Sequence, residues 1–167
     1  NPGFPRIFGS DFAGIVKSTG SGVTKFKVGD RVYGASPVIW GKPGALAQLL
    51  AVDQKYARII PEGMSFEEAA SLPIAALTAL NGLRRTGVKK GTTVLINGAT
   101  GGVGHFAVQI AKAKGAMVTG TCNPANAELA RRLGADSTIG YNKEDLSATE
   151  NRFDAILDAY GHMKTGD

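Results

Sequence analysis

Cysteine is almost absent from this chain of 167 residues, which contains only Cys122. A single cysteine cannot form an internal disulfide, and it cannot supply a Cys-rich structural zinc loop. No apolar run reaches the roughly 18 residues that a membrane-spanning helix needs, and the first residues lack the basic and apolar segments of a secretion signal. We therefore expect no membrane span and a reducing, cytoplasmic location.

Acidic residues are scarce in the middle of the chain. Residues 81–133 contain one acid, Glu128, and the following eight basic residues: Arg84, Arg85, Lys89, Lys90, Lys112, Lys114, Arg131 and Arg132. Aromatic residues are not interleaved with these charges and no dense arginine cluster occurs, so we expect no nucleic-acid partner. The basic residues can attract an anionic small molecule, or they can simply form solvated helix faces.

Residues 12–60 have the pattern of strands and turns, with Gly29-Asp30 as a turn signal ahead of an apolar run. The segments expected to contain strands are FAGIVKSTG (12–20), SGVTKFKVGDRVYG (21–34), GALAQLLAVD (44–53) and YARII (56–60). Together they predict a β-rich module. Two helices should follow. Ser65 and Glu68 have the spacing of a capping box before EEAASL, and Pro73 is expected to begin IAALTALNGLRR.

From residue 91 the pattern alternates between strand and helix. The expected strands are TTVLIN (92–97), AMVTGTC (116–122), STIGY (137–141) and FDAILDAYG (153–161). The first helix lies between the first two strands and places five apolar residues on one face: Val103, Phe106, Ala107, Ile110 and Ala111. Asn123 and Pro124 open the next helix, which Gly134 closes. The predicted fold class is α/β, with a doubly wound parallel sheet.

The turn after the first of these strands matches the GxGxxG fingerprint of dinucleotide-binding folds, with alanine in the first position. Its small residues allow a tight turn, a close backbone approach to a pyrophosphate and close packing of helix on strand. We therefore predict that six residues contact a dinucleotide: Ala99, Thr100, Gly101, Gly102, Val103 and Gly104. A merely structural glycine turn is the alternative.

A second dehydrogenase pattern fits the same letters. Gly98, Gly102 and Gly104 spell the GxxxGxG of short-chain dehydrogenases, and Tyr160 with Lys164 spells YxxxK. We reject this interpretation because Tyr160 follows a strand rather than lying on a long helix, and because a long β-rich segment precedes the glycines.

The end of the second strand bears on the choice of cofactor. An NAD-selective site usually has Asp or Glu there, to accept a hydrogen bond from the ribose 2′-hydroxyl, whereas this chain has Cys122 and Asn123. The absence of a carboxylate favours NADPH over NADH. Cys122 is interpreted as a wall residue beneath the adenosine rather than a reactive thiol. Residues expected to complete this part of the site are Asn126, Tyr141 and Lys143, the last two as partners of a 2′-phosphate.

The chain resembles the medium-chain dehydrogenase/reductase superfamily, in its zinc-independent quinone oxidoreductase and enone (alkenal) reductase branch. Segments that carry the resemblance are GSDFAGIVKSTGSGVTKFKVGDRVYG (9–34), EEAASLPIAALTAL (67–80), GATGGVGHFAVQIAKAKGA (98–116) and LGADSTIGY (133–141). The resemblance implies a partial GroES-like catalytic domain over residues 1–61 and the first part of a Rossmann domain over residues 62–167.

The zinc-dependent alcohol dehydrogenases of that superfamily differ from this chain at their metal ligands. They have a His and a helix-borne Cys where this chain has Ser10 and Ile74, neither of which is a suitable zinc ligand. Without a Lewis acid, alcohol oxidation becomes difficult, but hydride transfer to a quinone or to an enone or enal remains feasible. The alternatives are a non-catalytic NADPH-binding protein of crystallin or scaffold type and a zinc-dependent alcohol dehydrogenase.

The resemblance also implies roles for single residues. Thr78 should face the nicotinamide, although it can instead bond within its own helix, and His105 is interpreted as a helix-start residue. Trp40 is a candidate for the substrate mouth or for an oligomer contact. No catalytic residue is assigned. Because relatives are much longer, we expect this chain to lack turnover by itself, and homodimerisation through segments outside it stays open.

Overall fold

A computed structural model describes residues 7–38, 41–141 and 153–161. The chain divides into two compact units, Asn1–Ile74 and Ala75–Asp167. The predicted positions Trp40, Lys143 and Lys164 lie outside the described residues. Among the described residues, none of the helices has both the length and the apolar composition needed to cross a membrane.

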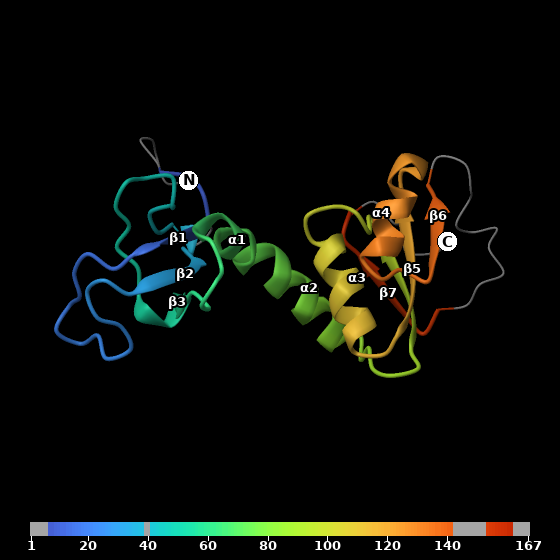
Figure 1. Cartoon of the computed structure of the whole chain (residues 1–167), viewed down its shortest axis with the longest axis horizontal. Helices are drawn as coiled ribbons and strands as arrows, with labels where there is room; N and C mark the ends of the chain where they lie inside the picture. The colour runs from blue at the N-terminus through green and yellow to red at the C-terminus, as the bar shows by residue number, and fades with distance from the viewer. Residues whose placement is uncertain (1–6, 39–40, 142–152, 162–167) are drawn as a thin grey trace. The chain divides into compact units, whose positions relative to one another are not determined.

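The first unit contains a three-stranded antiparallel sheet in the order β1-β2-β3, as Figure 1 shows. The strands are β1 (Asp11–Ile15), β2 (Arg31–Ala35) and β3 (Ala57–Ile59). Strand β2 lies in the middle, with its Gly34 opposite Phe12 of β1 and Ala57 of β3. The β-rich module predicted for this part of the chain is confirmed.

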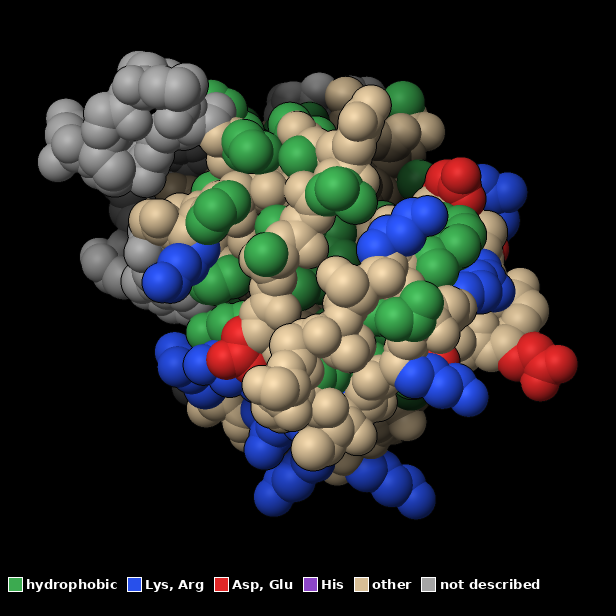
Figure 2. All heavy atoms as spheres, turned by 90° about the vertical axis from the view of Figure 1, so that its left-hand side faces the viewer, with side chains coloured by type: hydrophobic (Ala, Val, Ile, Leu, Met, Phe, Trp, Pro, Cys, Tyr) green, Lys and Arg blue, Asp and Glu red, His purple; other side chains and the backbone are tan. Residues whose placement is uncertain are grey.

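The strand predicted within residues 44–53 is wrong. This segment contains bends and no strand, and it leads into a short 3-10 helix, η2 (Gln54–Tyr56). A strand requires a ladder of backbone hydrogen bonds to a partner strand. The N–H groups of Gly44 and Leu46 donate instead to the carbonyl oxygens of Ile7 and Phe8. Leu46 and Leu49 are 77% and 73% exposed, and Figure 2 shows hydrophobic side chains on the surface.

The two predicted helices follow the sheet. Helix α1 (Phe66–Ser71) begins with the expected capping box, in which Ser65 accepts the N–H of Glu68 and the Glu68 carboxylate accepts the N–H of Ser65. Helix α2 (Pro73–Arg85) begins at the predicted proline. Arg31, beside the predicted turn, donates to the carbonyl oxygen of Met64 at 2.8 Å.

The second unit is built on a parallel sheet in the order β6-β5-β4-β7 (Figure 1). Its strands are β4 (Thr93–Asn97), β5 (Met117–Cys122), β6 (Ser137–Gly140) and β7 (Ala155–Asp158). Helix α3 (Gly104–Ala113) connects β4 to β5, and η3 (Pro124–Asn126) with α4 (Ala127–Arg132) connects β5 to β6. The predicted α/β class with a parallel sheet is confirmed.

Apolar side chains from α2, α3 and the strands form one core in this unit. Leu83, Val94, Ile96, Val108 and Val118 are fully buried. Each such side chain contributes about 1.5–3 kcal/mol by leaving water. The predicted inner face of α3 is confirmed, because two of its residues are buried and the other three pack against this core. The chain order also reverses here, since β4 lies between β5 and β7, which is where doubly wound folds bind ligands.

Candidate functional site

The candidate site is the turn that joins β4 to α3 at the carboxyl edge of the parallel sheet. Gly98 leaves the strand with a φ of +78°, a conformation that favours glycine. The N–H of Ala99 donates to the carbonyl oxygen of Thr121 at 2.8 Å, and the N–H of Gly101 donates to that of Gly98 at 2.9 Å. The turn is therefore tied both to the neighbouring strand β5 and to its own first residue.

The small residues of the predicted fingerprint have two different environments. Gly104 is buried, and a methyl group there would collide with the Gly98 carbonyl oxygen, so this position serves helix packing. Ala99 fits against Gly120 of β5, where a methyl group would lie 2.6 Å from the Ala99 Cβ. Gly101 and Gly102 are exposed, and a methyl group at Gly102 would meet no heavy atom within 4 Å. A methyl group at Gly101 would lie 3.3 Å from the Gly98 carbonyl oxygen, so only Gly102 borders open space.

The turn offers several backbone donors. Within the described part of the chain, the N–H groups of Thr100, Gly102, Val103 and Gly104 have no hydrogen-bond acceptor. The N–H of Gly101 is already used inside the turn, and that of His105 donates to the Gly101 carbonyl oxygen. Free N–H groups at the start of a helix carry partial positive charge and favour a bound anion. The residues present therefore fit a phosphate-bearing ligand.

A buried polar network supports the turn from below. The hydroxyl of Thr121, which is fully buried, donates to Asn97 Oδ1 at 2.5 Å and accepts the N–H of Gly98 at 2.9 Å. Asn97 in turn donates through Nδ2 to Asp158 Oδ1 at 2.8 Å. The ends of β5, β4 and β7 are thus joined by side chains. We did not predict this network, although Asn97 and Thr121 are polar residues in mainly apolar strands.

The predicted residues that follow β5 differ in exposure. Cys122 is 2% exposed, and burial raises the pKa of its thiol, with Arg131 acting in the opposite direction. The Asn123 side chain accepts the N–H of Ala125 at 3.0 Å and so caps η3, as expected. Asn126 and Tyr141 are exposed. A buried thiol with a raised pKa is a poor nucleophile, which agrees with a wall residue.

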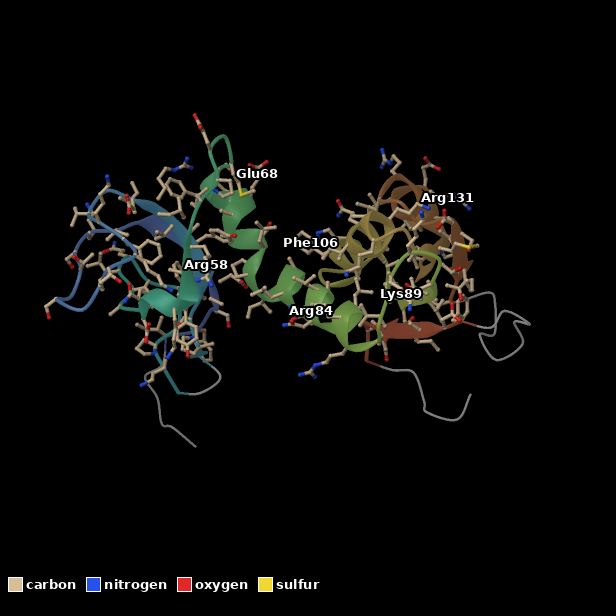
Figure 3. All side chains as sticks on the ribbon, turned by 90° about the horizontal axis from the view of Figure 1, so that it is seen from below. Arg58, Glu68, Arg84, Lys89, Phe106 and Arg131 are labelled. Carbon is tan, nitrogen blue, oxygen red and sulfur yellow. The ribbon has the colours of Figure 1, made fainter. Side chains whose placement is uncertain are left out.

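Arg131 is a cation that we did not include in the predicted site. It extends from α4 (Figure 3), and its guanidinium donates to Thr138 Oγ1 on β6 at 3.1 Å. Asp136, which lies before β6, pairs with Lys112 while it accepts the N–H of Val118 at 2.7 Å. These two partners, Lys112 first, hold the pKa of Asp136 below its usual value.

The remaining predicted residues lie on other elements. Thr78 is exposed on α2. Ser10 precedes β1, and Ile74 is 46% exposed in the first turn of α2, where its N–H donates to Asp11 Oδ1 at 2.8 Å. No group of three His, Cys, Asp or Glu side chains suited to a metal occurs among the described residues. Because neither Ser10 nor Ile74 offers a zinc ligand, these positions do not fit that metal.

Known protein families match most of the chain. Residues 1–62 match the family model of the alcohol dehydrogenase GroES-like domain, and residues 102–166 match the model of the zinc-binding dehydrogenase. A chloroplast envelope quinone oxidoreductase homolog from Arabidopsis thaliana is 38% identical over 169 residues, which cover 98% of this chain and 51% of that protein. The chain therefore spans about half the length of the curated relatives it matches.

Solved structures give the same result. The quinone oxidoreductase from Coxiella burnetii superposes with a TM-score of 0.90 and 39% identity over 95% of this chain and 50% of that one. The Escherichia coli quinone oxidoreductase complexed with NADPH superposes with a TM-score of 0.79 and 38% identity, over 87% of this chain and 44% of that one. Both of these proteins are similar to the chain in sequence as well as in fold.

Proposed function

Since the chain belongs to the medium-chain dehydrogenase/reductase superfamily, in its quinone oxidoreductase and enone reductase branch, we propose that the protein is an NADPH-dependent, zinc-independent oxidoreductase. The acceptor is a quinone or the activated C=C bond of an enone or enal. The observation that supports this best is the β4–α3 turn, which presents backbone N–H groups without acceptors beside open space. A relative of the same branch was solved with NADPH bound.

Each part of the dinucleotide has proposed partners. The pyrophosphate is held by the backbone N–H groups that lack an acceptor, those of Thr100, Gly102, Val103 and Gly104, because a helix start stabilises an anion. Cys122 and Asn123 border the adenosine, and no carboxylate stands directly after β5 to repel a 2′-phosphate. Tyr141, with Lys143, binds that phosphate, Asn126 adds a contact beside it, and Thr78 faces the nicotinamide.

The chemistry follows from these roles. The bound cofactor supplies a hydride, and this chain's residues bind and orient it. Quinones, enones and enals are already electron-poor, so a Lewis acid is not needed to activate them. This agrees with Ser10 and Ile74 at the positions where the zinc-dependent relatives have ligands. The domain limits at residue 61, the cytoplasmic location and a homodimer remain proposals.

Binding and turnover of the complete protein test the proposal. Titration with NADPH and NADH should give tighter binding of NADPH, and NADPH should be oxidised with at least one acceptor in a panel of quinones, enones and enals. Failure to bind either cofactor would refute the proposal. Binding without turnover on any acceptor would favour a non-catalytic NADPH-binding protein, and stoichiometric zinc in the purified protein would favour an alcohol dehydrogenase.

A further inference from the structure

The side chain of His105 contacts the glycine turn directly. Its Nδ1 lies 3.0 Å from the carbonyl oxygen of Gly101, which also accepts the backbone N–H of His105 at 3.0 Å. A carbonyl oxygen can only accept, so Nδ1 must carry the hydrogen in this contact. One carbonyl group of the turn is thus held by two donors of the same residue.

The imidazole ring is itself held in place. It lies against the ring of Phe106, with 4.0 Å between the ring centroids. Phe106, at the start of α3 (Figure 3), packs against the core of the second unit. The backbone carbonyl of His105 also accepts a hydrogen bond from Gln109 Nε2 at 3.0 Å. His105 is half-buried, so its ring is positioned rather than freely rotating in solvent.

These contacts fix the orientation of one peptide group. In a trans peptide the carbonyl oxygen and the following N–H point in opposite directions. Because His105 holds the Gly101 carbonyl toward helix α3, the N–H of Gly102 in the same peptide group points away from the helix. This N–H has no acceptor within the described part of the chain, and Gly102 borders open space. A rotated peptide would withdraw this donor from an incoming anion.

We propose that His105 is a positioning residue that holds the Gly101–Gly102 peptide so that the Gly102 N–H is aimed at the pyrophosphate of the bound dinucleotide. The proposal rests on the proposed function, since it assumes a dinucleotide at this turn. It extends the interpretation of His105 as a helix-start residue: the backbone N–H of His105 alone would serve the helix, whereas the ring contact is additional.

Three substitutions in the complete protein separate the hydrogen bond from the ring. His105→Phe keeps a ring beside Phe106 but removes the donor, and His105→Ala removes both. His105→Ser restores a donor without a ring, because a serine hydroxyl can bond the carbonyl four residues earlier. The affinities for NADPH, ADP-ribose and adenosine 2′-monophosphate are measured by calorimetry, with a thermal melt to check the fold of each variant.

The expected result is a loss confined to ligands that contain the pyrophosphate. His105→Phe and His105→Ala should bind NADPH and ADP-ribose about three- to tenfold more weakly, the amount that one hydrogen bond represents. His105→Ser should stay close to the wild type. Adenosine 2′-monophosphate, which lacks the pyrophosphate, should bind equally to all four proteins.

Other outcomes overturn the proposal. Wild-type affinity of His105→Phe would show that the ring, not its N–H, matters, and an equal loss for adenosine 2′-monophosphate would indicate a general structural effect. Weak binding by His105→Ser, despite a wild-type melting temperature, would also contradict it. If the wild type binds NADPH and ADP-ribose while the variants give one of these contrary results, only the role of His105 is refuted and the proposed function stands. If the wild type binds neither ligand, the proposed function fails as well.

Discussion

Asn97 at the end of β4 donates its side-chain N–H to Asp158 Oδ1 at the end of β7, across 2.8 Å. The two strands are neighbours in the sheet, and the two residues are 61 positions apart in the chain. The same carboxylate oxygen accepts the backbone N–H groups of Tyr160 and Gly161, so it organises the turn that follows β7. The edge of the sheet that borders the candidate site is therefore held by side chains as well as by the strand ladder.

Thr121 is the most deeply buried member of this network, and Thr121→Val removes its hydroxyl with little change of shape. The substitution leaves the buried Asn97 Oδ1 and the part-buried Gly98 N–H without their partner, which costs about 1–3 kcal/mol for each group that water does not reach. We expect the free energy of unfolding to fall by about 2–4 kcal/mol, measured by urea denaturation.

Thr119→Val is the matched control on the same strand. The Thr119 hydroxyl bonds Ser137 Oγ at 2.8 Å, and this pair is exposed to water. Its loss should change the free energy of unfolding by no more than about 0.5 kcal/mol. Equal effects of the two substitutions would show that the buried network does not stabilise the fold.

The two environments in the glycine turn predict opposite phenotypes for a single added methyl group. Gly104→Ala forces a Cβ into the Gly98 carbonyl, so it should destabilise the fold. Gly102→Ala meets no protein atom and should leave the thermal melt unchanged, but its methyl group enters the space proposed for the pyrophosphate. We expect its NADPH affinity to fall by about tenfold or more, equivalent to about 1.4 kcal/mol.

Calorimetric titration of both variants with NADPH, beside a thermal melt, checks this prediction. An unchanged affinity in Gly102→Ala would argue against a dinucleotide at this turn. A stable Gly104→Ala protein would show that α3 can shift away from the turn without a large cost.

Local signals in the sequence were sufficient for much of the fold. The capping box at Ser65 and the apolar face of α3 depend on residues three or four positions apart, and both are present as predicted. The segment 44–53 failed because apolar content does not reveal whether a partner strand is available, and its N–H groups bond to Ile7 and Phe8 instead.

The site was predictable only in part, for the same reason. The glycine turn is a contiguous motif, and it does form between β4 and α3. Its supports are not contiguous: Thr121 and Asn97 are 24 positions apart, and register between strands decides that they meet. The position of Arg131 also depends on tertiary structure, because α4 turns this side chain onto Thr138 of β6.

A charge at the end of β5 should change the cofactor preference. Asn123→Asp is isosteric and keeps the cap on the Ala125 N–H, since aspartate is an equally good cap. The new carboxylate would repel the 2′-phosphate of NADPH and could accept a hydrogen bond from the 2′-hydroxyl of NADH. We expect NADPH to bind about tenfold more weakly, with NADH binding unchanged or tighter.

The ratio of the two dissociation constants measures this effect. Asn123→Ser, which retains a cap without a charge, should leave the ratio close to the wild-type value. A ratio that stays constant in Asn123→Asp would mean that the 2′-position of the ribose does not lie beside this residue.

The stability of the protein should fall in acid because the folded state stabilises the ionised form of Asp154 and Asp136. Asp154 accepts hydrogen bonds from the N–H and the hydroxyl of Thr93, each at 2.8 Å, and these bonds hold its pKa below the usual value. The ion pair with Lys112, together with the N–H of Val118, lowers the pKa of Asp136 in the same way. In the unfolded chain both groups return to an ordinary pKa of about 4.

The sign follows from proton binding. Below about pH 4 the unfolded chain binds protons that the folded protein still excludes, so the free energy of unfolding decreases as the pH falls toward the lowered folded-state pKa values. Above about pH 5 both states are ionised and this contribution is fully present. Urea denaturation between pH 7 and pH 3 should show the decrease, and Asp154→Asn, which cannot titrate, should make it shallower. An identical pH dependence in Asp154→Asn would contradict the role of this carboxylate, because the protons taken up on unfolding would then have to bind to other groups.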